Sequence, residues 1–393
     1  MPITASKPAF IDPSDDAPVA TYVDALFDLA VRRRASDIHL EPQKHELTIR
    51  LRVDGLLQYV PSPPHDIAHR LCARIKVMAA MDIAERRLPQ DGRFTASSDG
   101  QPLDLRVSSL PTLWGEKLVL RLVPNDSSIL ALADLGLSSS QHHDFLNALS
   151  KPQGLILVTG PTGSGKTLTL YSALQYLNQP HRNISTAEEP IEIPMAGINQ
   201  IGIKPRIGLG FAETLRALLR QDPDVLMVGE IRDSNTASMA IRAAQTGHLV
   251  LSTVHTKSAS ATLMRLNQLG ISRQDIAESV TLILAQRLLR LLCDHCKIPA
   301  TTTSASNHGQ ALGHRYQAAL SGCKHCLQGY RGRIGIFELC LPEASGDTLP
   351  RIRQKNKNTR NLRDMALGCY EAGSTSLDEV NRVVPSESGS VAR

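Results

Sequence analysis

The segment that most constrains the fold of this chain runs from residue 160 to residue 167 and reads GPTGSGKT. It fits the pattern G-x-x-x-x-G-K-[S/T], in which backbone N–H groups and a lysine surround the phosphates of a nucleotide. A short apolar run at 155–158 precedes the segment, and a helical pattern at 168–174 follows it. An ordinary glycine-rich turn is the alternative, but such a turn does not require a match at every position. The sequence therefore predicts an α/β domain that binds a nucleoside triphosphate.

The residues of this loop have distinct expected roles. Gly163 and Gly165 allow the backbone to turn its N–H groups toward phosphate, and the following helix adds the positive end of its dipole. Lys166 is expected to reach the β and γ phosphates, and the Thr167 hydroxyl is expected to hold Mg²⁺. The predicted nucleotide-binding residues are Gly160, Pro161, Thr162, Gly163, Ser164, Gly165, Lys166 and Thr167.

Composition excludes several other classes of protein. At 393 residues, the chain is long enough for two or three domains. The 43 lysines and arginines nearly balance the 38 aspartates and glutamates, and 4% of residues are aromatic, which argues against direct nucleic-acid binding. No apolar run approaches the roughly 20 residues that span a bilayer, and the opening residues, MPITASKPAF, lack the apolar core of a signal peptide. We expect a cytoplasmic protein that contacts a membrane only through partners.

Four of the seven cysteines form two C-x-x-C pairs. A redox pair or a cytosolic disulfide is the alternative to a metal site, but neither explains why the pair is duplicated. Four thiolates at this spacing supply one tetrahedral Zn²⁺ site, so we expect a structural zinc. His295 and His325 lie inside the pairs and could replace a ligand, although surface positions suit them better. The predicted ligands are Cys293, Cys296, Cys323 and Cys326.

The pattern of prolines, glycines and polar runs predicts the domain organisation. Residues 1–18 are expected to form a flexible arm, 19–125 an α+β domain, and 126–393 the P-loop domain. Apolar and polar residues alternate over 47–53, and Asp54-Gly55 then predicts a hairpin turn. The other segments expected are helices near 21–34 and 69–82, strands near 102–110 and 116–123, a linker at 124–128, a zinc subdomain at 290–330 and a carboxy-terminal helical region at 340–385.

Acidic and histidine side chains follow the predicted strands of the P-loop domain. Glu230 comes directly after the apolar run 225–228, where P-loop proteins place an acid beside Mg²⁺ and the attacking water. That acid is usually aspartate, so Glu230 is expected to serve metal and water together. Glu188 and Glu189 follow another short strand, with a solvated turn as the alternative. His255 ends a third strand, where a neutral imidazole can position water, although most histidines at strand ends do not.

In this order, the segments GPTGSGKT, STAEEPIE, DPDVLMVGEIRD and GHLVLSTVHT resemble the Walker A, aspartate, Walker B and histidine boxes of the bacterial secretion ATPases. The phrases RRRASDIHLEP, LPQDGRF, TLRALLRQDPD and AQRLLRLLCDHC are also similar to that superfamily, and the resemblance covers nearly the whole chain. The tetracysteine insert is similar to that of the type II secretion and type IV pilus assembly ATPases. Pilus retraction ATPases generally lack this insert.

The resemblance implies a RecA-type P-loop core with a smaller, PAS-like α+β amino-terminal domain and a tetracysteine zinc subdomain. It implies a homohexamer that uses ATP, Mg²⁺ and Zn²⁺. Arg93 and Arg106 are the arginines expected to contact the phosphates from the amino-terminal domain, with a solvated sheet face as the alternative. Glu188 and Glu230 are expected to position the water and the metal.

The resemblance further implies that His248 and His255 link the nucleotide to neighbouring parts of the ring. Two departures limit the carry-over. The aspartate box usually reads Glu-Asp-Pro, whereas Glu189 stands here in place of the aspartate, so its role is open. Relatives commonly carry a further amino-terminal domain that docks on an inner-membrane platform protein, whereas little precedes residue 21 here. We expect a short form of such an ATPase.

The expected function is a hexameric motor ATPase, peripheral at the inner membrane, that drives assembly of a type IV pilus or a type II secretion pseudopilus through a membrane platform protein. Other secretion or DNA-uptake pathways are alternatives. A P-loop kinase, a nucleic-acid translocase and a nucleotide-binding scaffold with little turnover are alternatives of other classes. A phosphate-acceptor assay and measured phosphate release separate the kinase and the scaffold from the motor.

Overall fold

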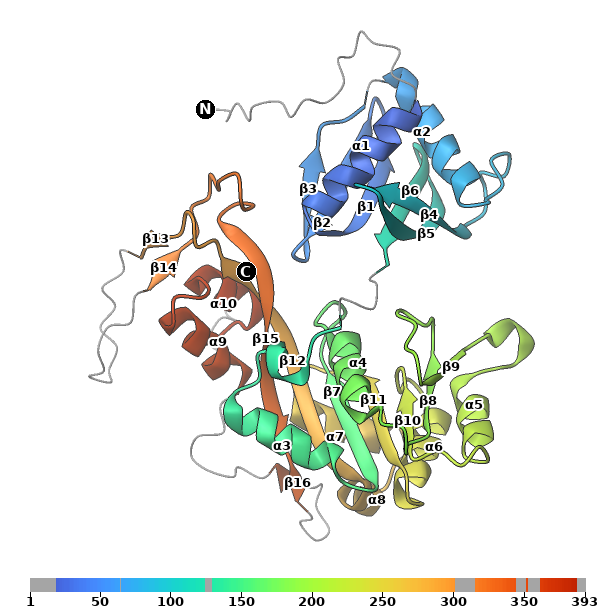
Figure 1. The fold of residues 1–393 in the computed structure, drawn as a ribbon, viewed down its shortest axis with the longest axis vertical. Helices are drawn as coiled ribbons and strands as arrows, with labels where there is room; N and C mark the ends of the chain where they lie inside the picture. Colours follow the sequence, from blue (N-terminus) through green and yellow to red (C-terminus); the bar gives the residue numbers. More distant parts are fainter. Residues whose placement is uncertain are drawn as a thin grey trace. The chain divides into compact units, whose positions relative to one another are not determined.

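The chain divides into two units, Met1–Pro124 and Asn125–Arg393, and each is described here by itself (Figure 1). The expected arm 1–18 and linker 124–128 lie outside the residues that the computed structural model describes. The described residues are 19–63, 65–123, 129–300, 315–343, 351–352 and 361–386.

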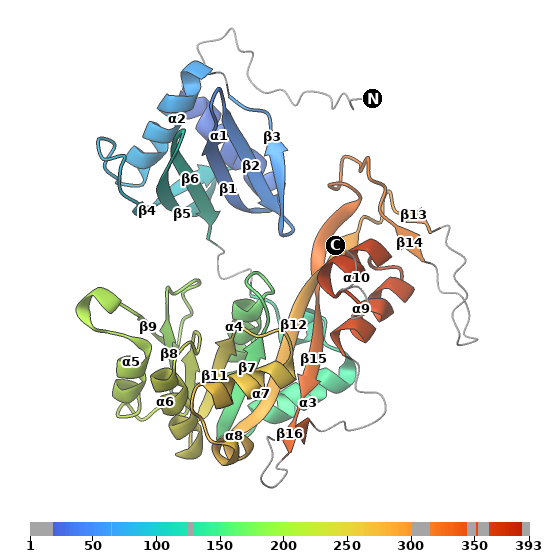
Figure 2. The same cartoon turned by 180° about the vertical axis from the view of Figure 1, so that it is seen from behind.

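The first unit is an antiparallel sheet with two helices on one face (Figures 1 and 2). Over its described residues the strand order is β3-β2-β1-β6-β5-β4. Its strands are β1 (Ala35–Pro42), β2 (Leu47–Val53), β3 (Leu56–Val60), β4 (Gln90–Ser98), β5 (Gln101–Thr112) and β6 (Gly115–Leu122). Its helices are α1 (Val19–Arg32) and α2 (His65–Met78).

The alternation of apolar and polar residues along β2 turns its apolar side chains into the core of this unit, as the sequence predicts. Leu47, Ile49, Leu51 and Val53 are buried, and the turn that follows has positive φ at Asp54 and Gly55. The predicted hairpin turn joins β2 to β3, and the two strands pair antiparallel. The strands β1 and β4 are not predicted by the sequence patterns described above. In β1 the alternate positions Asp37, His39 and Glu41 carry polar or charged side chains that are nevertheless buried, so the strand lacks the usual alternation of apolar and polar residues.

The helix expected near 69–82 is α2, which runs from His65 to Met78 instead. Its end is set by the backbone of Ala80, which has φ +54. The N–H of Met81 then bonds to the carbonyl of Lys76 at 2.9 Å, a six-to-one closure of the helix end. The expected boundary is therefore wrong because an alanine, and not a glycine, takes the left-handed position.

The second unit has a mainly parallel sheet, as the sequence predicts. Over the described residues its strand order is β15-β12-β7-β11-β10-β8-β9, in which only the β12–β15 pairing is antiparallel. These strands are β7 (Gly154–Thr159), β8 (Ile184–Glu188), β9 (Asn199–Gly202), β10 (Val225–Val228), β11 (Leu249–Val254), β12 (Val280–Leu292) and β15 (Tyr330–Cys340). Two-stranded pairs β13 (Ile298–Pro299) with β14 (Tyr316–Gln317) and β16 (Pro342–Glu343) with β17 (Arg351–Ile352) are also present.

Helices cover both faces of this sheet. One face packs against α3 (Ser139–Leu149) and α4 (Lys166–Leu177), with Tyr171 and Phe145 fully buried between them and the strands. The other face packs against helices α5 to α8. These are α5 (Phe211–Leu218), α6 (Ser234–Gln245), α7 (Ala259–Gln268) and α8 (Arg273–Ser279). Both faces of β7 and β11 are thus buried, which explains their continuous apolar sequences.

The carboxy-terminal helices α9 (Leu362–Glu371) and α10 (Leu377–Val383) share an apolar cluster with β12 and β15, and a buried carboxylate ties α10 to β12. Glu379 is 1% exposed and accepts hydrogen bonds from Arg290 (2.8 Å) and Arg382 (2.6 Å). Burial alone would raise its pKa, but these arginines hold the pKa of Glu379 at about 2, below the ordinary 4.5. A depressed carboxyl pKa stabilises the fold at pH values above the ordinary pKa, and this stabilisation is lost as pH falls toward 2.

We predict that Glu379→Gln lowers the unfolding temperature by several degrees at pH 7, because it removes the charge that the partly buried Arg290 requires. The difference from wild type should narrow as pH falls from 4.5 toward 2, because the wild-type carboxyl then becomes protonated too. Thermal unfolding at several pH values measures this. Glu371→Gln, at an exposed position on α9, is the matched control, and an equal shift in both variants would contradict the prediction.

Candidate functional site

The glycine-rich loop connects β7 to α4 at the carboxyl edge of the parallel sheet, as expected (Figure 1). Gly160, Gly163 and Gly165 all have positive φ, at 154°, 77° and 87°. A Cβ at Gly160 would lie 2.5 Å from Ser164 Oγ, so only glycine fits there. The Ser164 hydroxyl is buried and has no hydrogen-bond partner among the described residues. A cradle with a buried, unpartnered hydroxyl fits a phosphate group.

Lys166 is the first residue of α4, and its ammonium group folds back over the loop. It donates to the carbonyls of Gly160 (2.8 Å) and Pro161 (3.0 Å). Burial lowers the pKa of Lys166 to about 8, although Glu230 opposes the shift. The group is therefore still mainly protonated at pH 7. A compact cation held within the loop can bind an incoming phosphate by exchanging two carbonyl oxygens for phosphate oxygens.

Glu230, immediately after β10 and Gly229, lies close to His255, immediately after β11. His255 Nε2 is 3.4 Å from one carboxylate oxygen of Glu230, and Arg232 is 2.5 Å from the other. Burial and the charge of Lys166 lower the pKa of His255, so its imidazole is neutral at pH 7. Three of the residues expected to form the site, Lys166, Glu230 and His255, thus lie together at this sheet edge.

Glu188 and Glu189 point to different environments. Glu189 is one-third exposed and its carboxylate lies 3.3 Å from Arg232, which also pairs with Glu230. Glu188 is 3% exposed, and its carboxylate accepts hydrogen bonds from Tyr171 and, at 2.6 Å, from the Thr186 hydroxyl. The solvated turn considered for these two glutamates is therefore wrong for Glu188.

A second cation near the phosphate loop is not predicted by the sequence patterns. Arg287 on β12 donates to the carbonyls of Gln286 (2.8 Å) and Lys257 (2.7 Å). A Cβ at Gly160 would lie 3.2 Å from its guanidinium, and its charge contributes to the lowered pKa of Lys166. Its only sequence signal is the phrase AQRLLR, which carries no local motif for phosphate.

His248 lies away from this cluster. It precedes β11, whereas His255 follows β11, and a six-residue strand separates the two by about 20 Å. Its Nδ1 is 3.0 Å from the carbonyl of Ala243 near the end of α6. The ring lines a hollow of about 420 Å³ together with Arg216 and Arg242. The two histidines of this segment thus face opposite edges of the sheet.

In the first unit, Arg93 and Arg106 are directly opposite each other on β4 and β5. Arg106 is in turn opposite Arg121 on β6, and Arg121 donates to Asp37 on β1 at 3.0 Å. Leu105 and Val107 point to the buried face, so Arg106 lies on the opposite face, as predicted. The three arginines thus form one row on this face, in which Asp37 compensates the charge of Arg121.

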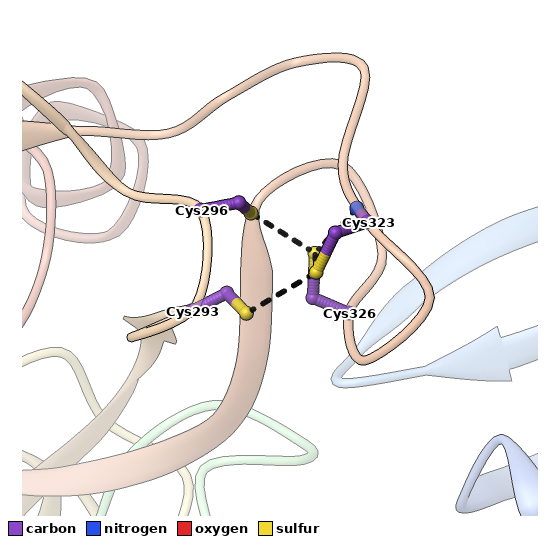
Figure 3. A group of neighbouring side chains, drawn as sticks. All are labelled: Cys293, Cys296, Cys323 and Cys326. Atoms are coloured by element: carbon purple, nitrogen blue, oxygen red, sulfur yellow. Dashed lines mark hydrogen bonds between the residues drawn. The ribbon is translucent and has the colours of Figure 1, made fainter.

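The cysteine pairs meet at the end of the β12–β15 hairpin (Figure 3). The four Sγ atoms lie within 4.8 Å of one another. Sγ of Cys293 is 3.8 Å from Cys323, and Sγ of Cys296 is 3.5 Å from Cys326. Zn–S bonds of about 2.3 Å in a tetrahedron require sulfur atoms about 3.8 Å apart, so this donor set fits zinc. All four thiols are free, so the structure favours the metal site over the disulfide alternative.

The two histidines inside the cysteine pairs stack on each other, with ring centroids 4.2 Å apart. The described group of possible metal ligands consists of the four cysteines alone. His295 and His325 therefore contact each other outside the sulfur cluster, and the cysteines need no substitute ligand.

A family profile described as "Type II/IV secretion system protein" matches residues 12–382. The chain belongs to this family. Among its curated relatives, the type IV pilus assembly ATPase PilB of Acinetobacter baylyi is 47% identical over 386 residues, covering 94% of this chain and 67% of the relative. The type II secretion system ATPase E of Vibrio cholerae is 43% identical over 385 residues, covering 95% of this chain and 76% of the relative.

Two solved structures share the fold of this chain. The ATPase DotB of Legionella pneumophila has a TM-score of 0.68 at 21% identity, covering 96% of each chain. The pilus retraction motor PilT with bound ADP has a TM-score of 0.61 at 26% identity, covering 93% of this chain and 98% of that one. The expected P-loop core with a smaller α+β unit is thus confirmed. No helix in the described part of the chain is long and apolar enough to cross a membrane.

Proposed function

We propose that this member of the type II/IV secretion family is a hexameric motor ATPase that drives assembly of a type IV pilus or a type II secretion pseudopilus. The observation that carries the proposal is the convergence of Lys166, Glu230 and His255 on a phosphate-binding loop. The relatives named as a pilus assembly ATPase and a type II secretion ATPase support the choice of process.

In this proposal the loop residues 160–167 bind ATP. The exposed Thr167 hydroxyl and Glu230 hold Mg²⁺, which neutralises charge on the phosphate oxygens. Lys166 supplies a fixed positive charge, and neutral His255 can donate a hydrogen bond beside Glu230. Glu188 orients the attacking water. The chemistry is phosphoryl transfer to water, in which the protein contributes position and charge.

The proposal extends to the assembly. Six copies form a ring at the cytoplasmic side of the inner membrane, in which Arg93 and Arg106 of an amino-terminal domain approach the phosphates of a nucleotide. Their placement in one row with Arg121 supports an anionic partner for this face. The ring acts on an inner-membrane platform protein, contacts the membrane only through such partners, and does not bind nucleic acid directly.

Phosphate release from ATP by the purified full-length chain tests the proposed activity. We expect Mg²⁺-dependent release with no added acceptor. Transfer of phosphate to an added acceptor, without release to water, would favour a kinase. Binding of ATP without release would favour the scaffold. Deletion of the gene should then abolish pilus assembly or secretion, which separates the motor from an ATPase of another pathway.

The same proposal assigns Zn²⁺ to Cys293, Cys296, Cys323 and Cys326. Four thiolates form a closed tetrahedral set with no position for water, so the role of the metal is structural. Backbone N–H groups support the sulfurs: Cys323 N lies 3.2 Å from the sulfur of Cys326, and His325 N lies 3.4 Å from that of Cys323. The metal would tie the end of β12 to the start of β15.

We predict about one zinc ion per chain in protein purified without chelator or oxidant. Cys323→Ser should release the metal, because a closed site loses one of its four ligands, and metal binding in such sites contributes on the order of 10 kcal/mol. Elemental analysis measures this, and nucleotide affinity should remain unchanged. Cys369→Ser, a cysteine outside the cluster, is the control and should retain its zinc. Much less than one zinc in the wild type would refute the assignment.

A further inference from the structure

The hydroxyl of Tyr171 is the centre of a buried hydrogen-bond network. Tyr171 lies on α4 and is fully buried. Its hydroxyl donates to the carboxylate of Glu188 and accepts the backbone N–H groups of Glu192 (3.1 Å) and Ile193 (3.4 Å). A phenol hydroxyl has one donor and two acceptor positions, so its whole capacity is used.

The carboxylate of Glu188 is held from several elements at once. The Thr186 hydroxyl on β8 donates to its other oxygen at 2.6 Å, and the Gln200 amide on β9 donates to the same oxygen at 3.1 Å. Gln200 also bonds to the carbonyl of Ile193 (3.0 Å), next to the segment that Tyr171 holds. A buried carboxylate requires such donors. Because the donors come from three elements, they fix the carboxylate in a single orientation.

Tyr171 also connects this carboxylate to the phosphate loop. It follows Lys166, the first residue of α4, by five positions, which is about 7.5 Å along the helix axis. A phenylalanine would fill the same apolar space against Leu170 and Leu174, so packing alone does not require the hydroxyl. The hydroxyl adds a polar link between the helix that carries the phosphate-binding lysine and the acid at the end of β8.

We propose that Tyr171 is a positioning residue for ATP hydrolysis. It holds the Glu188 carboxylate at a fixed distance from the phosphate loop. The position of the carboxylate relative to the bound phosphates is then constant. The proposal rests on the proposed function, in which Glu188 orients the attacking water. Tyr171 itself does not touch the nucleotide in this assignment and acts only through Glu188.

The first test is Tyr171→Phe in the full-length chain. We expect kcat for ATP hydrolysis to fall about tenfold to a hundredfold, the effect of losing one hydrogen bond to a charged group, while KM and the affinity for ATP stay within about twofold. Tyr176→Phe is the matched control, because Tyr176 is a half-exposed tyrosine on the same helix. Its kcat should equal that of wild type. Equal kcat in all three proteins would overturn the proposal.

A second comparison separates positioning from stability. Tyr330→Phe removes another buried tyrosine hydroxyl of the same unit, which contacts Ser376 at 2.6 Å. If Tyr171→Phe and Tyr330→Phe lose similar thermal stability but only the first loses kcat, the positioning role is supported. If both lose kcat in proportion to stability, the role of Tyr171 is structural and the proposal is wrong.

A third comparison uses the carboxylate itself and does not depend on α4. Thr186→Val replaces a buried strand hydroxyl with a methyl group and removes another donor to Glu188, so kcat should fall while KM does not change. In a Glu188→Gln background, Tyr171→Phe should cause no further loss, whereas an additive loss would overturn action through Glu188. A wild-type chain that releases no phosphate overturns the proposed function, and this assignment with it. Wild-type kcat in Tyr171→Phe, beside a lowered kcat in Glu188→Gln, overturns this assignment alone.

Discussion

Lys166→Ala is expected to abolish phosphate release from ATP. The ammonium group is the cation held inside the glycine-rich loop, where it bonds to the carbonyls of Gly160 and Pro161. Its removal leaves the β and γ phosphates without this charge, and P-loop hydrolysis depends almost entirely on position and charge. Phosphate release and the binding of a fluorescent ATP analogue measure the two effects. Lys151→Ala, an exposed lysine ahead of β7, is the control and should retain wild-type release.

Glu230→Gln separates binding from turnover at the same site. The amide keeps the size of the side chain but removes the charge that lies 3.4 Å from His255 and 2.5 Å from Arg232. We expect ATP binding to persist while turnover stalls, because the charge is needed for the metal and the water. Unchanged phosphate release in either Lys166→Ala or Glu230→Gln would refute the assigned roles.

Ala substitution of Arg93 or Arg106 is expected to lower turnover by up to about a thousandfold, the effect of losing an arginine that contacts the transferred phosphate. Because both side chains are at least partly exposed on the open face of the sheet, the fold should be retained, and circular dichroism with thermal unfolding checks this.

The control for these variants is Arg87→Ala, which removes an exposed arginine of the same unit that pairs with Glu85 on the surface. Its turnover should equal that of wild type. A loss of less than about threefold in both Arg93→Ala and Arg106→Ala would instead show that this face is merely solvated. Loss in one variant alone would identify which arginine contacts the phosphate.

Sequence patterns predict well those elements whose structure depends on residues that are adjacent in the sequence. The run 155–158 is apolar at every position because β7 is buried on both faces, and the glycines that follow are required by positive φ. The two C-x-x-C pairs likewise carry their chemistry in their spacing, and the structure brings their sulfurs together. In each case the physical requirement acts within a few residues of the chain.

Elements with polar residues at buried positions are not predicted by local hydrophobic patterns. Strand β1 buries Asp37 and Glu41, together with His39, on one face, and cations of the adjacent strands pair with the two carboxylates. Glu41, for example, lies 2.6 Å from Arg50 on β2 and 2.7 Å from Lys117 on β6. The sequence around β1 shows no sign of these partners, so no local pattern indicates that it is a strand with one buried face.

The sequence by itself determined the phosphate loop, the parallel core around it and the cysteine cluster, because each depends on local backbone geometry or on ligand spacing. Only the tertiary structure decided which charges meet. Glu188 receives the hydroxyl of Tyr171, 17 positions earlier, and Glu379 pairs with Arg290, 89 positions earlier. A buried carboxylate is stable only beside donors, and folding selects those donors by distance in space and not along the chain.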